Sequence, residues 1–314
     1  MKKLLILVGL LFVFSISAYA QQYLKVLIPK SLEKSFSIIA KDFYDKHRIK
    51  INYESNCSGK AAKLIHDYGK IIDVIVSADY SIIDNVLMKK GFADWNIKFA
   101  KNEMVLGYRT DSKFANKINK NNWYEIVLKP NVKFGLSAAT DEPCGYRSLM
   151  VLKLAELFYN KKDFYQHVIN KATFERKSDL DIVKDLLYKK VDYIISYKTY
   201  ANEYNFNYLK LPKEINLFSS RYGSFYKKVR IKDQTYELGI KEIPATCIFY
   251  SVTIPQTTQK RNLAVKFVKY LLSNEVASIL EKHGFFVLCE PEVTGNIERL
   301  DNELKPLVKY CVRY

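Results

Sequence analysis

Hydrophobic and polar residues follow two alternating rhythms along most of the chain. Short runs rich in β-branched residues have the spacing typical of strands, and between them apolar residues recur every three or four positions, as on one face of a helix. The first part of this pattern predicts strands at residues 23–29, 49–55 and 71–79 and helices at 31–47 and 59–69. Such a βαβαβ order is typical of a largely parallel sheet with helices on its faces.

A second unit again combines short strands with longer helices. The pattern predicts strands at residues 132–139 and 191–197 with helices at 145–160 and 177–190 between them. A strand at 247–255 and one long amphipathic helix at 261–284 close the chain, and Gly284 is placed to end that helix. Sheets of this kind bind ligands at the carboxyl ends of their strands.

The boundary between the two units is not marked by any low-complexity tract or Pro-rich linker. It must therefore lie within strand-like segments, and residues 102–110 and 236–247 are the candidates. Two crossings make one domain discontinuous, so we expect one domain from residues 21–103 and 245–314 and a second from 104–244.

The first 20 residues have the features of a signal peptide. They combine Lys2 and Lys3, a short apolar run and an Ala18-Tyr19-Ala20 ending, which predicts cleavage after Ala20 and export to the periplasm. An uncleaved membrane anchor is the alternative interpretation. No cysteine follows the cleavage point, so a lipid-anchored form is not indicated, and no later apolar stretch is long enough to span a membrane.

The chain is strongly basic, which raises the question of acidic partners. Its formal charge is +17. The predicted signal peptide, called the leader below, contributes two lysines and no acid, so the remaining 294 residues carry +15. Nucleic acids, membranes or acidic polymers would suit that charge. The lysines are scattered in pairs such as 89–90, 161–162 and 189–190, without long blocks, which favours solvated helix faces and argues against a nucleic-acid partner. Binding to an acidic polymer would show as affinity that falls steeply with salt.

Cysteines and histidines give no pattern typical of a metal site. The five cysteines are an odd number for an exported protein, so at least one is free or pairs outside the chain. None shows the CxxC spacing and the four histidines are scattered, so we expect neither a zinc site nor a cofactor.

Three junctions between a strand and a helix share one kind of chemistry. Ser31 and Ser58 each precede a helix, and Glu142-Pro143 stands at the start of a third. A helix N-terminus presents unpaired N–H groups and a partial positive charge, which together suit an oxyanion. Serine is also a favoured helix cap, so each junction alone is more often structural. Their coincidence in a two-domain α/β chain favours an anion site.

At these residues the chain resembles a known family, the periplasmic molybdate/tungstate-binding proteins of ABC transporters. The resemblance is carried by SADYSIID (77–84), FAKNEMVLGYR (99–109), NNWYEIVLKPNVKFGLS (121–137), DEPCGYRSLMVLKLAELFY (141–159), LPKEINL (211–217) and VTIPQ (252–256). It implies an α/β type II periplasmic-binding-protein fold, with two α/β lobes that close on the ligand. It also implies a monomer that captures molybdate or tungstate and delivers it to a membrane permease, without a cofactor.

The resemblance also implies a set of binding residues. Ser31 and Ser58 would bind the oxyanion from the first lobe, and Glu142, with Asp141 beside it, from the second. Glu142 would be a possible direct ligand to molybdenum or tungsten. Cys144 and Tyr146 at the same helix start, and Ser196, complete the candidate oxyanion-binding set. Tyr146 and its neighbour Arg147 could line the cleft or brace the lobe.

This chain departs from the family at two positions. Ser196 stands where the family commonly has a glutamate that binds the metal, and Lys30 precedes Ser31 where the family usually has glycine. Replacing a carboxylate by a hydroxyl removes one possible metal ligand, and a lysine adds positive charge if it faces the cleft. Both changes favour a four-coordinate oxyanion held by hydrogen bonds, and they leave the preference among molybdate, tungstate, sulfate and other tetrahedral oxyanions open.

An enzyme is the main alternative from another class of protein. Cys144 lies where a helix N-terminus could lower the pKa of its thiol, as in cysteine-dependent enzymes. No general base with a known spacing accompanies Cys144 in the sequence, so we expect binding and no catalysis.

Overall fold

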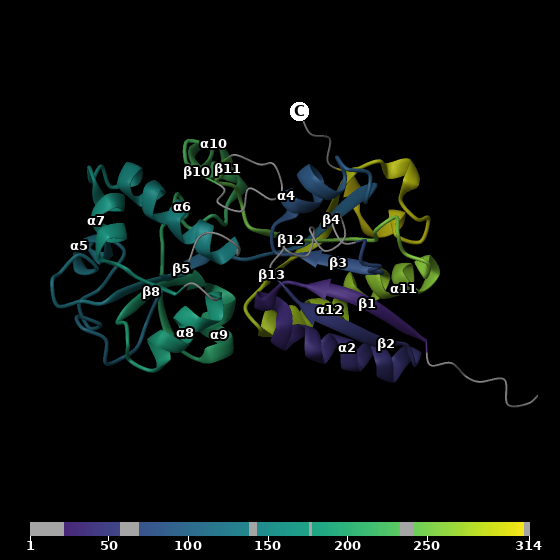
Figure 1. The fold of residues 1–314 in the computed structure, drawn as a ribbon, viewed down its shortest axis with the longest axis horizontal. Helices are drawn as coiled ribbons and strands as arrows, with labels where there is room; N and C mark the ends of the chain where they lie inside the picture. The colour runs from purple at the N-terminus through teal and green to yellow at the C-terminus, as the bar shows by residue number, and fades with distance from the viewer. Residues whose placement is uncertain (1–21, 57–68, 138–142, 176–177, 233–241, 311–314) are drawn as a thin grey trace, which may run out of the picture.

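The computed structural model describes residues 22–56, 69–137, 143–175, 178–232 and 242–310. The predicted leader, the predicted helix at 59–69 except for its last residue, Ser58, Asp141 and Glu142 lie outside these residues. Figure 1 shows two halves side by side, each built around its own sheet, which we call lobe 1 and lobe 2. Both halves are α/β, as the sequence predicts, but their sheets combine parallel and antiparallel strands and are not largely parallel as expected.

Lobe 1 contains a seven-stranded sheet in the order β14-β13-β4-β12-β3-β1-β2. Strand β1 pairs in parallel with both β2 and β3, whereas β12 runs antiparallel to both β3 and β4. The sheet is therefore mixed. Its antiparallel strands β12 and β13 come from the C-terminal part of the chain. The strands are β1 (Tyr23–Ile28), β2 (Lys50–Ser55), β3 (Val74–Ser77), β4 (Trp95–Lys101), β12 (Phe249–Thr253), β13 (Phe286–Gly295) and β14 (Lys309–Tyr310).

Helices cover both faces of the lobe 1 sheet (Figure 1). In β1, Leu24 and Val26 pack into one buried cluster and Leu27 into another, as the alternation of side chains along a strand requires. The helices of this lobe are α2 (Glu33–His47), α4 (Tyr80–Ile82), which continues into a π-helical turn at Ile83–Leu87, α11 (Arg261–Leu271) and α12 (Asn274–Lys282).

Lobe 2 contains a five-stranded sheet in the order β7-β6-β8-β5-β9 and a two-stranded sheet, β10-β11. Its strands are β5 (Met104–Tyr108), β6 (Phe134–Ser137), β7 (Thr173–Glu175), β8 (Tyr193–Tyr197), β9 (Asn207–Lys210), β10 (Arg230–Lys232) and β11 (Glu242–Pro244). Its helices are α5 (Trp123–Ile126), α6 (Pro143–Phe158), α7 (Phe164–Lys171), α8 (Asp179–Leu187), α9 (Lys198–Tyr204) and α10 (Gly223–Tyr226).

The prediction of one long helix at 261–284 is wrong in one respect. The structure divides it into α11 and α12, because Ser273 adopts extended backbone angles and its side chain accepts a hydrogen bond from Val276 N. The glycine stop is confirmed: Gly284 follows α12 with a φ of +90°, a conformation that side chains with a Cβ rarely adopt.

The chain passes from lobe 1 to lobe 2 between β4 and β5 and returns between β11 and β12. Asn102 lies at the first crossing, where it is buried and its Oδ1 accepts a hydrogen bond from Glu103 N at 2.9 Å. This side-chain bond fixes the Asn102 amide, with its NH₂ group directed away from the backbone of the crossing.

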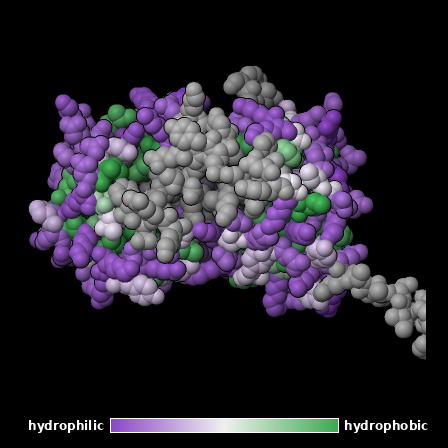
Figure 2. Space-filling model, in the orientation of Figure 1, coloured by the Kyte–Doolittle hydropathy of each residue, from purple (hydrophilic) through white to green (hydrophobic). Residues whose placement is uncertain are grey.

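Hydrophilic side chains dominate the face of the molecule in Figure 2, and hydrophobic ones lie singly or in small groups. The lysine pairs 89–90, 161–162 and 189–190 are exposed, but they lie in turns and connections after helices and not on helix faces as we expected. No described helix has the length and apolar character needed to cross a membrane.

Candidate functional site

Ser31 lies at the carboxyl end of β1, in a 3-10 turn (Lys30–Leu32) that leads into α2. Its side chain does not cap the helix: neither the turn nor α2 has a side-chain cap hydrogen bond. Ser31 is 3% exposed, and its Oγ lies 2.5 Å from the hydroxyl oxygen of Tyr250 on β12. The ordinary structural role of a serine at such a junction is therefore absent here.

The start of α6 lies against lobe 1. Pro143 is the first residue of the helix, as its fixed φ favours. Arg147 Nη1 donates to Ala78 O of lobe 1 at 2.8 Å, and Arg147 Nη2 lies 3.6 Å from Asp79 Oδ2. Tyr146 donates its hydroxyl proton to the same Asp79 carboxylate. Of the two roles considered for Tyr146 and Arg147, these contacts are those of braces, and they link the two lobes.

Charge and burial keep this bracing cluster in defined protonation states. Burial alone lowers the pKa of Arg147, but the neighbouring Tyr197, Tyr146 and Asp79 raise it above its ordinary value, so the guanidinium is charged. Burial raises the pKa of Tyr197 and of Tyr250, which are therefore neutral hydroxyls at physiological pH. Arg147 Nη1 donates to the Tyr197 hydroxyl oxygen at 2.6 Å, so the Tyr197 hydroxyl can donate its own proton to another acceptor.

A small cavity lies where Ser31 and the start of α6 meet. Its volume is about 10 Å³, enough for about one water molecule. Both lobes contribute to its lining, which consists of Pro29, Lys30, Ser31, Ala78, Pro143, Asp179 and Tyr197. Lys30, which the sequence singled out as a departure from the family, therefore does border this space.

Two lining residues, Asp179 and Tyr197, were not among the residues predicted from the sequence. Asp179 is the first residue of α8 and Tyr197 the last of β8, so both lie at strand and helix ends of the kind where α/β proteins bind ligands. That rule could have identified them. Tyr250 carried no such signal, because 219 residues separate it from Ser31.

Ser196 does not line this cavity. It precedes Tyr197 on β8, and successive side chains of a strand point to opposite faces of the sheet. Its side chain is fully buried, and Ser196 Oγ has no hydrogen-bond partner among the described residues. A buried hydroxyl of this kind costs free energy, typically about 1–3 kcal/mol.

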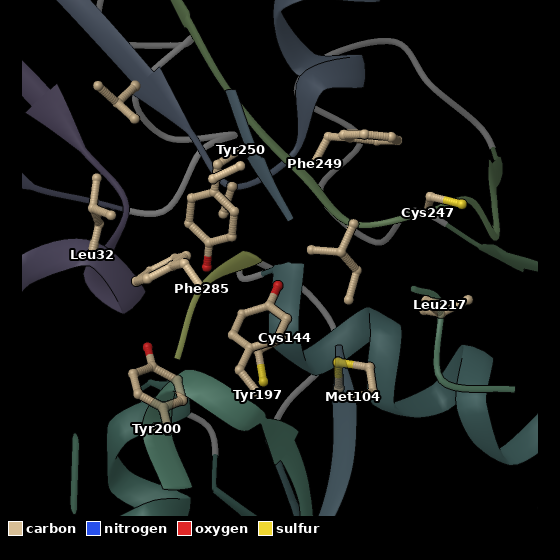
Figure 3. Close-up of a cluster of buried hydrophobic side chains, with 14 of the residues drawn as sticks. Leu32, Met104, Cys144, Tyr197, Tyr200, Leu217, Cys247, Phe249, Tyr250 and Phe285 are labelled. Atoms are coloured by element: carbon tan, nitrogen blue, oxygen red, sulfur yellow. The ribbon is translucent and has the colours of Figure 1, made fainter. Parts of the chain in front are cut away.

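Cys144 is 1% exposed and lies beside Tyr197 within the first turn of α6 (Figure 3). Cys247 is also buried and Cys289 is exposed; none of these three described cysteines forms a disulfide, in agreement with the expectation that at least one cysteine has no disulfide partner within the chain. Reactive cysteines are usually partly accessible to solvent, so the burial of Cys144 favours packing over nucleophilic catalysis.

Comparison with known proteins identifies the family. Residues 24–286 match the family of bacterial extracellular solute-binding proteins. The chain belongs to this family. A molybdate/tungstate-binding protein WtpA from Pyrococcus abyssi is 35% identical over 286 residues, which cover 83% of this chain and 81% of that relative. An uncharacterized solute-binding protein from Petrotoga mobilis is 34% identical over 284 residues, covering 89% of this chain and 88% of the relative.

Solved structures of other solute-binding proteins share the fold. The periplasmic molybdate-binding protein of Azotobacter vinelandii superposes with a TM-score of 0.61 at 16% identity, over 84% of this chain and 99% of that one. The sulfate-binding protein SubI of Mycobacterium tuberculosis gives a TM-score of 0.63 at 14% identity, over 84% and 86% of the two chains. The predicted two-lobe binding-protein fold is thereby confirmed.

Proposed function

We propose that this solute-binding protein captures molybdate or tungstate between its two lobes and delivers the anion to the permease of an ABC transporter. The observation that carries the proposal is the similarity, over more than four fifths of the chain, to a relative named as a molybdate/tungstate-binding protein. The buried Ser31 hydroxyl and the start of α6, which meet at one cavity, are consistent with it.

The proposed ligand contacts come from both lobes. Ser31 and Ser58 donate hydroxyl protons from lobe 1, and Glu142 binds the metal from lobe 2, with Asp141 beside it and the first N–H groups of α6 behind. Cys144 and Tyr146 support this helix start. The protein acts as an exported monomer, released from its leader after Ala20, and carries out no chemical reaction on the anion.

Sulfate is the second candidate ligand. Ser196 occupies the position of a carboxylate that could expand the coordination of a metal, and a site that holds its anion through hydroxyl and N–H donors alone would also suit sulfate. Direct titration separates these ligands.

The test is calorimetric titration of residues 21–314 with molybdate, tungstate and sulfate. We expect one anion per chain, and a melting temperature that rises with anion concentration, because ligand binding to the folded state stabilises it by mass action. Ser58→Ala should weaken binding of the preferred anion about tenfold, since hydrogen bonds to charged groups are typically worth about 1.5–3 kcal/mol.

Ser37→Ala is the matched control, because Ser37 is exposed on α2 and its hydroxyl donates only to Lys34 O of the same helix. It should leave the affinity unchanged. If none of the three anions at millimolar concentration binds or raises the melting temperature, the proposed function is wrong. If Ser58→Ala binds as the unmodified protein does, the site is misplaced.

A further inference from the structure

A chain of buried hydroxyl and amide groups leads from the crossing between the lobes to Ser31. Asn102 Nδ2 lies 3.4 Å from the Tyr250 hydroxyl oxygen and 2.9 Å from Thr199 Oγ1 of lobe 2, and the Tyr250 hydroxyl lies 2.5 Å from Ser31 Oγ. All four side chains are at most 3% exposed. Water therefore does not compete for these hydrogen bonds, and the neighbouring protein groups alone decide which atom donates and which accepts.

Asn102, at one end of this hydrogen-bonded series, determines which groups in it donate and which accept. Asn102 Oδ1 accepts from Glu103 N, so the NH₂ group of Asn102 is the part that faces Tyr250 and Thr199, and it can only donate. The Tyr250 oxygen accepts from this amide. Burial raises the pKa of Tyr250, so its hydroxyl keeps its proton, and Ser31 Oγ is its nearest acceptor.

We infer that Tyr250 is a positioning residue that makes Ser31 an obligate hydrogen-bond donor toward the cleft. Because Ser31 Oγ accepts the tyrosine proton, its own proton is directed to another acceptor, and Ser31 lines the cavity between the lobes. Each hydroxyl in such a chain is polarised by the one before it, which strengthens the last bond. The Tyr250 ring is held in turn by Phe285, packed edge-on with ring centroids 5.0 Å apart (Figure 3).

Asn102 links this hydrogen-bonded series to lobe 2. Its amide donates to Thr199 at the start of α9, so when the lobes are closed Thr199 helps to hold the Asn102 amide that orients Tyr250. The inference rests on the proposed function, because it assigns Tyr250 a role in the same anion site. It differs from that proposal in placing part of the anion affinity on a side chain that does not itself touch the anion.

The experiment is a double-mutant cycle on residues 21–314, with tungstate, molybdate and sulfate as the titrants. Tyr250→Phe removes the hydroxyl and keeps the ring against Phe285. In the unmodified background we expect it to weaken binding of the preferred anion about threefold to tenfold, since it leaves Ser31 free to turn its proton away. In a Ser31→Ala background, itself weakened about tenfold, Tyr250→Phe should change affinity by less than about twofold.

Tyr270→Phe is the matched control. Tyr270 is buried in the same lobe, its hydroxyl has no hydrogen-bond partner within the described residues, and its loss should not change anion affinity. The melting temperature of each anion-free variant reports structural damage separately. A loss of affinity that is the same in both backgrounds would show that Tyr250 acts through packing and overturn the inference.

Two further outcomes separate the inference from the proposed function. If the unmodified protein binds an anion and Tyr250→Phe binds it equally well, the positioning role is wrong while the function stands. If the unmodified protein binds none of the three titrants, the proposed function fails and the positioning role fails with it.

Discussion

Ser31 and Ser196 show how far a single residue type can be interpreted before its partners are known. The sequence identified Ser31 as a candidate because it follows a strand and precedes a helix, and the structure gives its hydroxyl a buried partner, Tyr250. Ser196 was chosen because of a missing carboxylate, and the structure buries it on the sheet face opposite Tyr197, away from the cavity lining. Residue type and local position were enough to make Ser31 a candidate, whereas a role for Ser196 depends on the direction of its side chain, which the sequence does not give.

Ser196 also provides a direct test of how the metal is coordinated. In the native protein we expect a bound metal that is four-coordinate or only partly expanded, because Glu142 alone cannot supply two additional ligands. In this structure the Ser196 side chain lies on the face of β8 away from the cavity, so the substitution tests whether position 196 reaches the bound anion. If it does, Ser196→Glu should weaken sulfate binding at least tenfold by charge repulsion and leave molybdate and tungstate binding unchanged or tighter, since these metals accept further oxygen ligands. If it does not, all three anions should lose affinity to the same extent. Calorimetry on the three anions measures the difference, and X-ray absorption at the metal edge measures the coordination number.

Ser196→Gln is the control for this substitution, because it has nearly the same shape without the charge. An equal loss for all three anions in both variants would mean that the buried position does not tolerate a longer side chain. Six short oxygen contacts in the unmodified protein would show that another residue, such as Asp141, replaces the missing ligand.

At the scale of helices and strands, periodicity predicted the long helices and the buried strands between them, and it missed shorter elements such as α7 and α9 and the breaks where elements join. The expected strand at 23–29 and helix at 31–47 match β1 and α2 to within two residues. The break between α11 and α12 was missed because apolar residues continue through it at a spacing of four: Val268, Val276 and Leu280 are buried and Leu272 is partly buried. Strand β13 was missed because its exposed and half-buried positions show little alternation.

Ser273 allows the break between the two helices to be tested. Its hydroxyl accepts from Val276 N at 3.4 Å, a long hydrogen bond, so Ser273→Ala should lower the free energy of unfolding by about 0.5–1 kcal/mol, the lower part of the range for helix caps. Ser278→Ala, at an exposed position of α12, should raise the free energy of unfolding or leave it unchanged, since alanine is the better helix former. Urea denaturation of both variants makes the comparison, and equal effects would contradict a capping role for Ser273.

At the scale of the whole molecule, the features that matter join residues far apart in sequence and in different lobes. Asn102 contacts Thr199, and Lys34 Nζ of lobe 1 donates to Glu203 O of lobe 2 at 2.8 Å and lies 3.6 Å from the centre of the Tyr204 ring. The sequence predicted two lobes from two successive units of strands and helices. It could not predict these pairs, because a contact between lobes depends on how two independently folded surfaces meet and leaves no periodic signal in either one.

Arg147 is the residue on which closure should depend most. It is 2% exposed, and its guanidinium contacts Ala78 and Asp79 of lobe 1 from the start of α6 in lobe 2. Arg147→Met would leave the Asp79 carboxylate buried without its cation whenever the lobes are closed, and removing one partner of a buried pair typically costs about 3–5 kcal/mol. When the lobes open, water solvates that carboxylate. The cost therefore falls mainly on closure, with a smaller effect on the folding of each lobe.

We thus expect anion-free Arg147→Met to show a larger radius of gyration by small-angle X-ray scattering than the unmodified protein. Saturating tungstate should reverse most of this expansion. The apparent affinity should fall at least tenfold, because the apparent dissociation constant rises as the binding-competent fraction falls. Arg261→Met is the control: Arg261 forms two 2.9 Å hydrogen bonds with Asp301 entirely within lobe 1. That variant should lower the melting temperature without changing the radius or the affinity. If Arg147→Met kept both the native radius and the native affinity, the contacts of Arg147 with lobe 1 would not be what holds the lobes closed.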